Sequence, residues 1–325
     1  MRIWRILAAS LPVVVGLAIL PALLTRDLLT ALFFTFIFTT LAANYDILGG
    51  FLRYINLGQG AFFGLAAYVA AVTLTRVPWG REQGGLSLAA AVLAAIVVTA
   101  VFAAGIAYPL FQVRGAYFAV ITFGLVLIIE QIVLNAGDLS GGSYGITIPA
   151  RHYPSLAVAY YAALAVAVAA VLLNFLIARS RLGIAFHALR DSETAASAIG
   201  IDPFRYKQVA LVVASIPSAA AGCLFALFMG HIYVETVLGF EVSLFPVIIA
   251  MLGGSGHVLG PVVGAVILRG LDVGLGYVAM PIPRPALYGL MLLFIGLFMP
   301  GGILRVLEAR RLRRAHPAWA GAARL

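Results

Sequence analysis

Long apolar runs fill this chain of 325 residues, and they limit what it can fold into more than any other feature. Most are about twenty residues long, the length that an α-helix needs to cross the hydrocarbon core of a bilayer. The chain is 63% hydrophobic and 10% charged, with a mean hydropathy of +1.07, whereas about a quarter of an ordinary soluble domain is charged. The period-two alternation of a membrane β-barrel is absent from the runs, and helices satisfy their own backbone hydrogen bonds in lipid. We therefore predict an all-α fold, a polytopic bundle of transmembrane helices.

The apolar runs predict about ten membrane segments. We place them at residues 6–24, 29–48, 54–75, 87–112, 115–134, 154–177, 208–229, 241–255, 259–279 and 285–300. The run 241–255 is short for a full crossing, so nine spans plus a re-entrant half helix is the alternative. Glycine clusters interrupt an apolar stretch in each half of the chain, which is typical of broken helices beside a translocation path and hints at an internal inverted repeat. They are Gly49, Gly50, Gly58 and Gly60 in the first half and, with Pro261, Gly253, Gly254, Gly256, Gly260 and Gly264 in the second. Close helix packing through glycine is the other explanation of these clusters.

The basic residues indicate membrane topology rather than a nucleic-acid partner. The net charge of +9 comes from Lys and Arg at the ends of apolar runs, not from one soluble face. With the N-terminus inside, fifteen of them lie in inner segments and five in outer segments. The positive-inside rule then makes both termini and the polar segment 178–207 cytoplasmic. We interpret 6–24 as a retained first helix rather than a signal peptide, so the chain divides into a transmembrane domain at 1–304 and a basic tail at 305–325 beside membrane lipid.

The polar segment 178–207 is the only long polar interruption of the chain, and it predicts two short helices. In its first half, Leu182, Phe186 and Leu189 recur at helical spacing and form one apolar face. The first of the two helices is therefore amphipathic.

The second helix is predicted to have only about seven residues. Asp191 or Ser192 caps its start, Glu193 lies in its positive first turn, and Gly200 supplies a left-handed end. Because so short a helix is unstable alone in water, something must pack on it. The small face of this helix consists of Ala195, Ala196 and Ile199. This face fits a groove on another protein and the chain's own bundle equally well.

The next membrane helix is predicted to begin with Asp202 as its cap and Pro203 in its first turn. Arg205 and Lys207 are expected to be held at the surface. Arg190 and Glu193 have the i, i+3 spacing of a helical ion pair, which contributes only a few tenths of a kcal/mol when it is exposed.

The second short helix also resembles a known element. Thr194-Ala-Ala-Ser-Ala-Ile-Gly200 resembles the EAA-x-x-x-G cytoplasmic loop with which permeases of bacterial ABC importers dock onto an ATPase subunit. The run from Ala188 to Lys207 is similar to the same segment of the branched-chain amino acid permeases of LivM type. Thr194 stands where the general motif has Glu, and Glu193 lies one place earlier. Further segments that match the family, in the right order, are 44–68, 114–124, 140–145 and 251–264.

The resemblance implies a permease subunit that translocates branched-chain, hydrophobic amino acids across the bacterial inner membrane. It implies three kinds of protein partner, namely two ABC ATPase subunits, a second homologous permease of LivH type and a solute-binding protein, with no nucleic acid. ATP and Mg are then bound by the ATPase subunits, and this chain holds no cofactor. The residues expected to couple the chain to the ATPase are Arg190, Glu193, Thr194, Ala195, Ala196 and Gly200.

Polar side chains within the apolar runs are few, and they are candidates for the translocation path. By polarity and position we select Asn56, Gln59 and Glu130. Glu130 and Asp272 are the deepest carboxylates, and they would couple ions to transport in a rival interpretation, a stand-alone secondary transporter. A third interpretation is an ABC permease for urea, short amides or a sugar.

Enzyme and metal signatures give no support to a catalytic role. The sequence has no phosphate-cradling Gly-x-x-x-x-Gly-Lys-Ser/Thr and no His-Glu-x-x-His, so we expect no ATP hydrolysis by this chain, no catalytic residue and no metal site. The single cysteine, Cys223, is predicted to be a small core residue.

Overall fold

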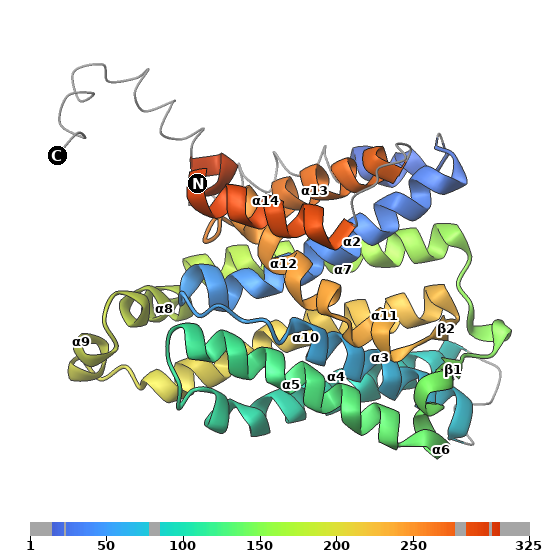
Figure 1. Cartoon of the computed structure of the whole chain (residues 1–325), viewed down its shortest axis with the longest axis horizontal. Helices are drawn as coiled ribbons and strands as arrows, with labels where there is room; N and C mark the ends of the chain where they lie inside the picture. Colours follow the sequence, from blue (N-terminus) through green and yellow to red (C-terminus); the bar gives the residue numbers. More distant parts are fainter. Residues whose placement is uncertain (1–14, 23, 78–84, 277–283, 299–300, 306–325) are drawn as a thin grey trace.

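The computed structural model describes residues 15–22, 24–77, 85–276, 284–298 and 301–305, and it shows helices running back and forth along one long axis (Figure 1). Most of the predicted segment 6–24 and nearly all of the predicted tail 305–325 lie outside the described residues.

Long helices form the bundle. They are α2 (Arg26–Asp46), which continues into the π-helical turn η2 (Ile47–Phe51), then α3 (Gln59–Arg76), α4 (Gly85–Leu110), α5 (Ala116–Asn135), α7 (Leu156–Arg179), α10 (Pro203–Met229), α12 (Phe240–Gly253), α13 (Gly260–Gly276) and α14 (Arg284–Phe298). Shorter elements connect them: η1 (Leu20–Ala22), α6 (Gly137–Ser140), η4 (Gly142–Tyr144), β1 (Ile146–Thr147), η5 (Ala150–His152), α8 (Arg181–Asp191), α9 (Glu193–Ala198), β2 (His231–Ile232) and α11 (Val234–Leu238).

The described part of the chain has six helical stretches that are long and apolar enough to cross a membrane. They are Arg26–Phe51, Gly85–Leu110, Ala116–Asn135, Leu156–Arg179, Pro203–Met229 and Val234–Gly253. Helices α3, α13 and α14 lie in the predicted runs 54–75, 259–279 and 285–300, but they are shorter or less apolar. The all-α, polytopic bundle is thus confirmed, and the number of about ten segments stays a prediction.

The short run predicted at 241–255 begins earlier in the structure. α11 and α12 follow one another across Gly239 and together make the twenty-residue stretch Val234–Gly253, long enough for a full crossing. Gly239 has a non-helical ψ of 158°, so the backbone turns between the two helices. Gly239 and the charged Glu235 and Glu241 beside it interrupt the apolar run, so the sequence predicted only its second part, from residue 241.

Helices α2 and α10 lie at the centre of the bundle, and α4 lies at its edge. In the most apolar window of α2 and of α10, 67% of the residues are buried, against 28% in α4. Small residues let α3 and α10 approach closely, because a side chain on Gly222 would collide with the carbonyl of Phe63. Cys223 is fully buried beside them, with its Sγ 3.7 Å from the carbonyl oxygen of Ala66. The prediction that Cys223 is a small core residue is confirmed.

The bundle has two distinct ends. One carries α8 and α9, and the opposite one carries the antiparallel pair β1 and β2, two residues each, a small exception to the all-α prediction (Figure 1). The element order places more of the described basic residues at the α8–α9 end, namely Arg53, Arg114, Arg179, Arg181, Arg190, Arg205, Lys207 and Arg305. Those at the opposite end are Arg26, Arg76, Arg151 and Arg284.

Candidate functional site

The long polar segment folds into the two predicted short helices, which project from one end of the bundle (Figure 1). Ser180 caps α8, and its hydroxyl accepts a 3.2 Å hydrogen bond from the amide of Leu182. The predicted apolar face of α8 is confirmed, because Phe186 and Leu189 are buried in the core and Leu182 packs against it.

Residues at its two ends determine where α9 begins and ends. Ser192, not Asp191, is its N-cap, with the hydroxyl accepting a 3.2 Å hydrogen bond from a first-turn amide. After the helix, Gly200 has a φ of +87°, the left-handed conformation that the sequence predicts. The amide of Ile201 then donates to the carbonyl of Ala196 at 3.0 Å, which closes the end of the helix.

The start of α10 matches its prediction in part. Asp202 caps it by accepting from the amide of Phe204 at 3.0 Å, and Arg205 is exposed, with 82% of its side chain accessible. The prediction that Lys207 lies at the surface is wrong, because Lys207 is only 3% exposed. Its Nζ lies 4.8 Å from the ring centroid of Tyr54, and two aromatic rings cover the side chain.

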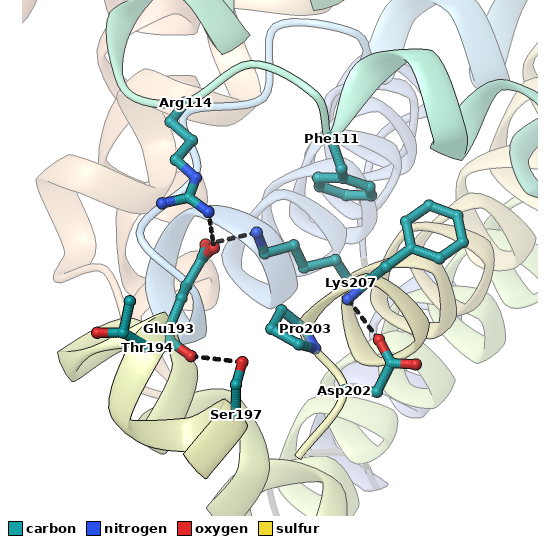
Figure 2. A pocket seen from close by; sticks show the side chains of 9 residues that line it. Phe111, Arg114, Glu193, Thr194, Ser197, Asp202, Pro203 and Lys207 are labelled. Carbon is teal, nitrogen blue, oxygen red and sulfur yellow. Dashed lines mark hydrogen bonds and ion pairs between the residues drawn. The ribbon is translucent and has the colours of Figure 1, made fainter. Parts of the chain in front are cut away.

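The carboxylate of Glu193 binds three side chains from three other segments. Oε1 accepts a 2.6 Å hydrogen bond from the hydroxyl of Tyr54 and is ion-paired with Lys207, and Oε2 lies 2.9 Å from Nη2 of Arg114. Lys207 Nζ also donates to the Tyr54 hydroxyl at 2.7 Å. Figure 2 shows Arg114 and Lys207 reaching the carboxylate from separate parts of the bundle. We call Tyr54, Arg114, Glu193 and Lys207 the Glu193 cluster.

The Glu193 cluster ties α9 to the bundle at three points. Tyr54 lies between η2 and α3, Arg114 between α4 and α5, and Lys207 near the start of α10. Partial burial raises the pKa of Glu193, but the hydrogen bonds from Lys207 and Tyr54 and the charges of Lys207 and Arg114 outweigh it, so the pKa is lowered. Hollows of about 300 and 390 Å³ flank the ion pair, and both are lined by Arg114, Glu193 and Thr194. At neutral pH Glu193 is therefore ionised, and its carboxylate attaches α9 to the bundle beside two open hollows.

The expected pair between Arg190 and Glu193 does not form. The backbone of Ser192 is extended, with φ −163° and ψ 116°, so α8 and α9 are separate helices and the i, i+3 relationship is lost. Nη1 of Arg190 instead donates to the carbonyl of Gly50 in η2, at 3.4 Å.

A second junction joins the two predicted glycine breaks. Oδ1 of Asp46 accepts hydrogen bonds from Ser255 Oγ at 3.0 Å and from the amide of Gly256 at 2.8 Å. A side chain on Gly50 would collide with this carboxylate and with the Gly256 amide. The glycine breaks of the two halves therefore meet at the end of the bundle that carries α8, and Arg190 contacts the same place.

The exposed face of α9 is small and apolar. Ala196 is 2% exposed and packs on the bundle, whereas Ile199 is 75% exposed. Thr194 and Ala195 are exposed as well. Of the predicted small face, Ala196 therefore packs on the protein's own bundle, whereas Ala195 and Ile199 remain accessible to another molecule.

The candidate path residues separate into two places. Asn56 and Gln59 are fully buried around the start of α3. Glu130 lies on α5 eight residues beyond Thr122, about 12 Å along the helix, and it is Thr122 that accepts a 3.1 Å hydrogen bond from the amide of Leu57 next to Asn56.

Asp272, the other deep carboxylate, has its own partners. It is ion-paired with Arg269, one turn earlier on α13, and accepts a 2.5 Å hydrogen bond from the hydroxyl of Tyr288 on α14. These contacts hold Asp272 as a structural ion pair rather than in a carboxylate pair with Glu130. Among the residues that the structure describes, no three His, Cys, Asp or Glu side chains gather as a metal site.

Sequence reasoning missed three of the four residues of the Glu193 cluster as site residues. Tyr54 and Arg114 belong to segments already matched to the family, but nothing in their spacing pairs them with Glu193. Lys207 had a usable signal, because it is the single lysine among 21 basic residues.

Residues 27–298 match the family model described as "Branched-chain amino acid transport system / permease component". The chain is 27% identical over 277 residues to the high-affinity branched-chain amino acid transport system permease protein LivM of Salmonella typhimurium, covering 76% of this chain and 63% of LivM. It is 25% identical over 287 residues to the corresponding LivH protein of Escherichia coli, covering 82% of this chain and 91% of LivH.

The chain thus spans less than two thirds of the length of the LivM relatives that it matches. An autoinducer 2 import system permease protein, LsrC of Shigella flexneri, is 32% identical over only 43% of this chain. No solved structure matches the chain significantly.

Proposed function

The chain belongs to the family of branched-chain amino acid transport permease components, and on that premise we propose that it is the membrane permease subunit of an ABC importer for branched-chain amino acids. One observation supports the proposal above others: α9 is fastened to three segments of the bundle through Glu193 while its outer face stays exposed. A short helix held in this way transmits force from a partner into the transmembrane helices.

We place the α8–α9 end of the bundle in the cytoplasm, with both termini on that side. The larger number of basic residues at this end supports the assignment through the positive-inside rule. An ATPase subunit then docks on α9, and the two ATPase subunits of the transporter bind the ATP and Mg, whereas this chain holds no cofactor. A solute-binding protein delivers the amino acid at the opposite end, in the cell envelope outside the inner membrane.

The transmission route follows from the contacts. A displacement of α9 moves the carboxylate of Glu193, and with it Tyr54 ahead of α3, Arg114 ahead of α5 and Lys207 in α10. A second contact, from Arg190 to Gly50, connects α8 to η2 and to the turn held by Asp46. ATP-driven motion of the partner thereby opens and closes the bundle on alternate sides.

A second permease of LivH type completes the membrane part of the transporter. The similarity of this chain to both LivM and LivH proteins supports a pairing of homologous subunits. The outer helices α4 and α5 expose large apolar side chains, among them Leu93, Val101, Val120 and Ile128, which suits a surface that faces lipid or a second permease.

Reconstitution tests the proposal. The chain is tagged, purified gently from its native membranes with the proteins that accompany it, and placed in vesicles with radiolabelled leucine. We expect an ATPase and a second permease to co-purify, and uptake to require ATP and the binding protein. Uptake without ATP would instead establish the ion-driven interpretation. Competition by urea, an amide or a sugar, but not by valine or isoleucine, would reassign the cargo.

A further inference from the structure

We propose that a buried polar cluster at the start of α3 binds the ammonium and carboxylate groups of the amino acid during translocation. The proposal rests on the proposed function and names the place where this chain contacts its substrate. We call the cluster the α3-start cluster, and its residues are Asn44, Asn56, Gln59, Ser218 and Ser243.

Helix α3 begins inside the protein rather than at its surface. Gln59, its first residue, is fully buried. Asn44 of α2 donates from Nδ2 to Ser218 Oγ at 2.9 Å, and Ser218 of α10 donates to Gln59 Oε1 at 2.9 Å. This chain of hydrogen bonds brings the amides of α2 and α3 together through a hydroxyl of α10.

Two further polar side chains converge on the same helix end. Asn56 accepts a 2.8 Å hydrogen bond at Oδ1 from the amide of Gly58, one residue before α3. Ser243 of α12 lies against Gly60, where its Oγ occupies the space that a side chain would need. Both Asn56 and Ser243 are fully buried. Side chains from α2, α10 and α12 therefore meet around the first turn of α3.

The α3-start cluster has spare hydrogen-bonding capacity. Among the described residues, Oδ1 of Asn44, Nδ2 of Asn56, Nε2 of Gln59 and Oγ of Ser243 have no hydrogen-bond partner, although all four atoms are buried. An unpaired buried polar atom destabilises a protein, and native structures contain few of them. Four around one helix end, buried within the bundle, indicate a site that exchanges hydrogen bonds with a passing ligand.

The unpaired atoms match the two ends of an amino acid. The amide donors of Asn56 and Gln59 lie at the positive end of α3, which favours a carboxylate. The acceptors on Asn44 and Ser243 suit an ammonium group, which can only donate. The five side chains carry no formal charge, so they fit a zwitterion of zero net charge, whereas a solute with net charge would be buried without compensation. Urea and sugars have no anionic group for the helix end.

The test uses the whole transporter with its ATPases and second permease, in vesicles supplied with the binding protein and radiolabelled leucine. We expect Asn44→Leu and Gln59→Leu each to lower leucine uptake roughly tenfold or more, because each removes a polar contact made during translocation. Uptake is expressed per assembled complex, so that a loss of folding is not counted as a loss of transport.

Asn174 provides the matched control. It is also fully buried, donates from Nδ2 to the carbonyl of Ala43 at 2.7 Å and leaves Oδ1 without a partner, but it lies on α7. We expect Asn174→Leu to retain uptake within about twofold of the wild type. A loss in this control equal to that in Asn44→Leu would show a general packing defect and overturn the site. The isosteric Gln59→Glu preserves shape and places a negative charge where the carboxylate binds, so it also loses uptake.

A binding measurement separates the two ends of the ligand. In nanodiscs without the binding protein, we expect labelled leucine to be displaced roughly tenfold more weakly by isocaproate, which lacks the ammonium, and by isoamylamine, which lacks the carboxylate, than by leucine itself. Equal displacement by either analogue overturns the proposal, and so does wild-type uptake by Gln59→Leu, since the cluster then holds only water. A wild-type transporter that moves another solute and no branched-chain amino acid overturns the proposed function instead.

Discussion

The hydroxyl of Tyr54 donates a 2.6 Å hydrogen bond to Oε1 of Glu193, although 139 positions separate the two residues. Tyr54 lies two residues before Asn56 in the loop that leads into α3, so this bond joins the exposed helix α9 directly to the α3-start cluster. Lys207 adds a parallel connection from the same carboxylate to α10, the helix that supplies Ser218. The proposed coupling surface and the proposed substrate contact are thus joined by one side-chain hydrogen bond and by the short stretch of backbone between Tyr54 and Asn56.

Replacing Glu193 should uncouple ATP hydrolysis from transport. Glu193→Gln keeps the size of the side chain but removes both ion pairs, which leaves Lys207 buried without a counter-charge. We expect a loss of about 1–3 kcal/mol in the attachment of α9 and a roughly tenfold fall in uptake with basal ATP hydrolysis retained. Asp191→Asn, an exposed neighbouring carboxylate, is the control and should leave both rates unchanged. Equal effects of the two substitutions would remove the special role of Glu193.

Lys207 should be far more sensitive than Arg205, although the two cations lie two residues apart. Lys207→Met removes the buried partner of Glu193 and should lower the thermal unfolding midpoint clearly, whereas Arg205→Met loses an exposed pair and should shift stability by less than about 0.5 kcal/mol. The double variant Glu193→Gln with Lys207→Met should be more stable than the sum of the single losses predicts, because no buried charge is left unpaired. Additive losses would contradict the contact.

Elements with local signals were predictable from the sequence. The cap at Asp202, the left-handed Gly200 and the apolar face of α8 each depend on a few consecutive residues, and each has the predicted geometry. The apolar runs likewise determine where most long helices begin and end, because lipid leaves the backbone little alternative.

Features that depend on packing were not predictable. The spacing of Arg190 and Glu193 suggested a helical pair, but the extended Ser192 separates their helices and Glu193 turns to three distant segments instead. Lys207 looked like a surface cation because it follows a helix cap, and only the fold shows the aromatic rings that cover it. Such contacts join residues far apart in the chain, so the local periodicity of the sequence does not predict them.

Gly200 should matter through its backbone alone. At φ +87° a Cβ would meet no atom within 4 Å, so the left-handed conformation, not space, requires glycine. Gly200→Val should cost about 1–2 kcal/mol, disturb the end of α9 and lower uptake relative to ATP hydrolysis, with normal membrane insertion. Gly200→Asn, which tolerates this conformation, should be close to wild type. Normal coupled transport by Gly200→Val would rule out this role of the helix end.

The attachment of α9 should be lost only in acid. The pKa of Glu193 is lower in the folded protein than its ordinary value of 4.5, so the carboxylate stabilises the fold fully above that pH and loses its contribution as the pH falls through the lowered value. A spin label at Ile199→Cys should therefore have constant mobility between about pH 6 and 8 and become mobile only at a pH below the ordinary pKa of 4.5. In Glu193→Gln the label should be mobile throughout. A rise in mobility near pH 7 in the otherwise unaltered protein would contradict the charged state assigned to Glu193.

Gly50 should tolerate no side chain, because its Cα faces the junction between the two glycine breaks. A Cβ there would collide with Oδ1 of Asp46 and with the amide of Gly256, so Gly50→Ala must break the hydrogen bonds that hold the turn after α12. We expect a loss of about 1–3 kcal/mol, seen as a lower thermal unfolding midpoint of the purified chain. Gly124 on α5 is the matched control, since a Cβ there meets nothing within 4 Å and alanine favours the helix by up to about 1 kcal/mol. If Gly50→Ala unfolded at the same temperature as Gly124→Ala, the contact between the two breaks would not contribute to the stability of the bundle.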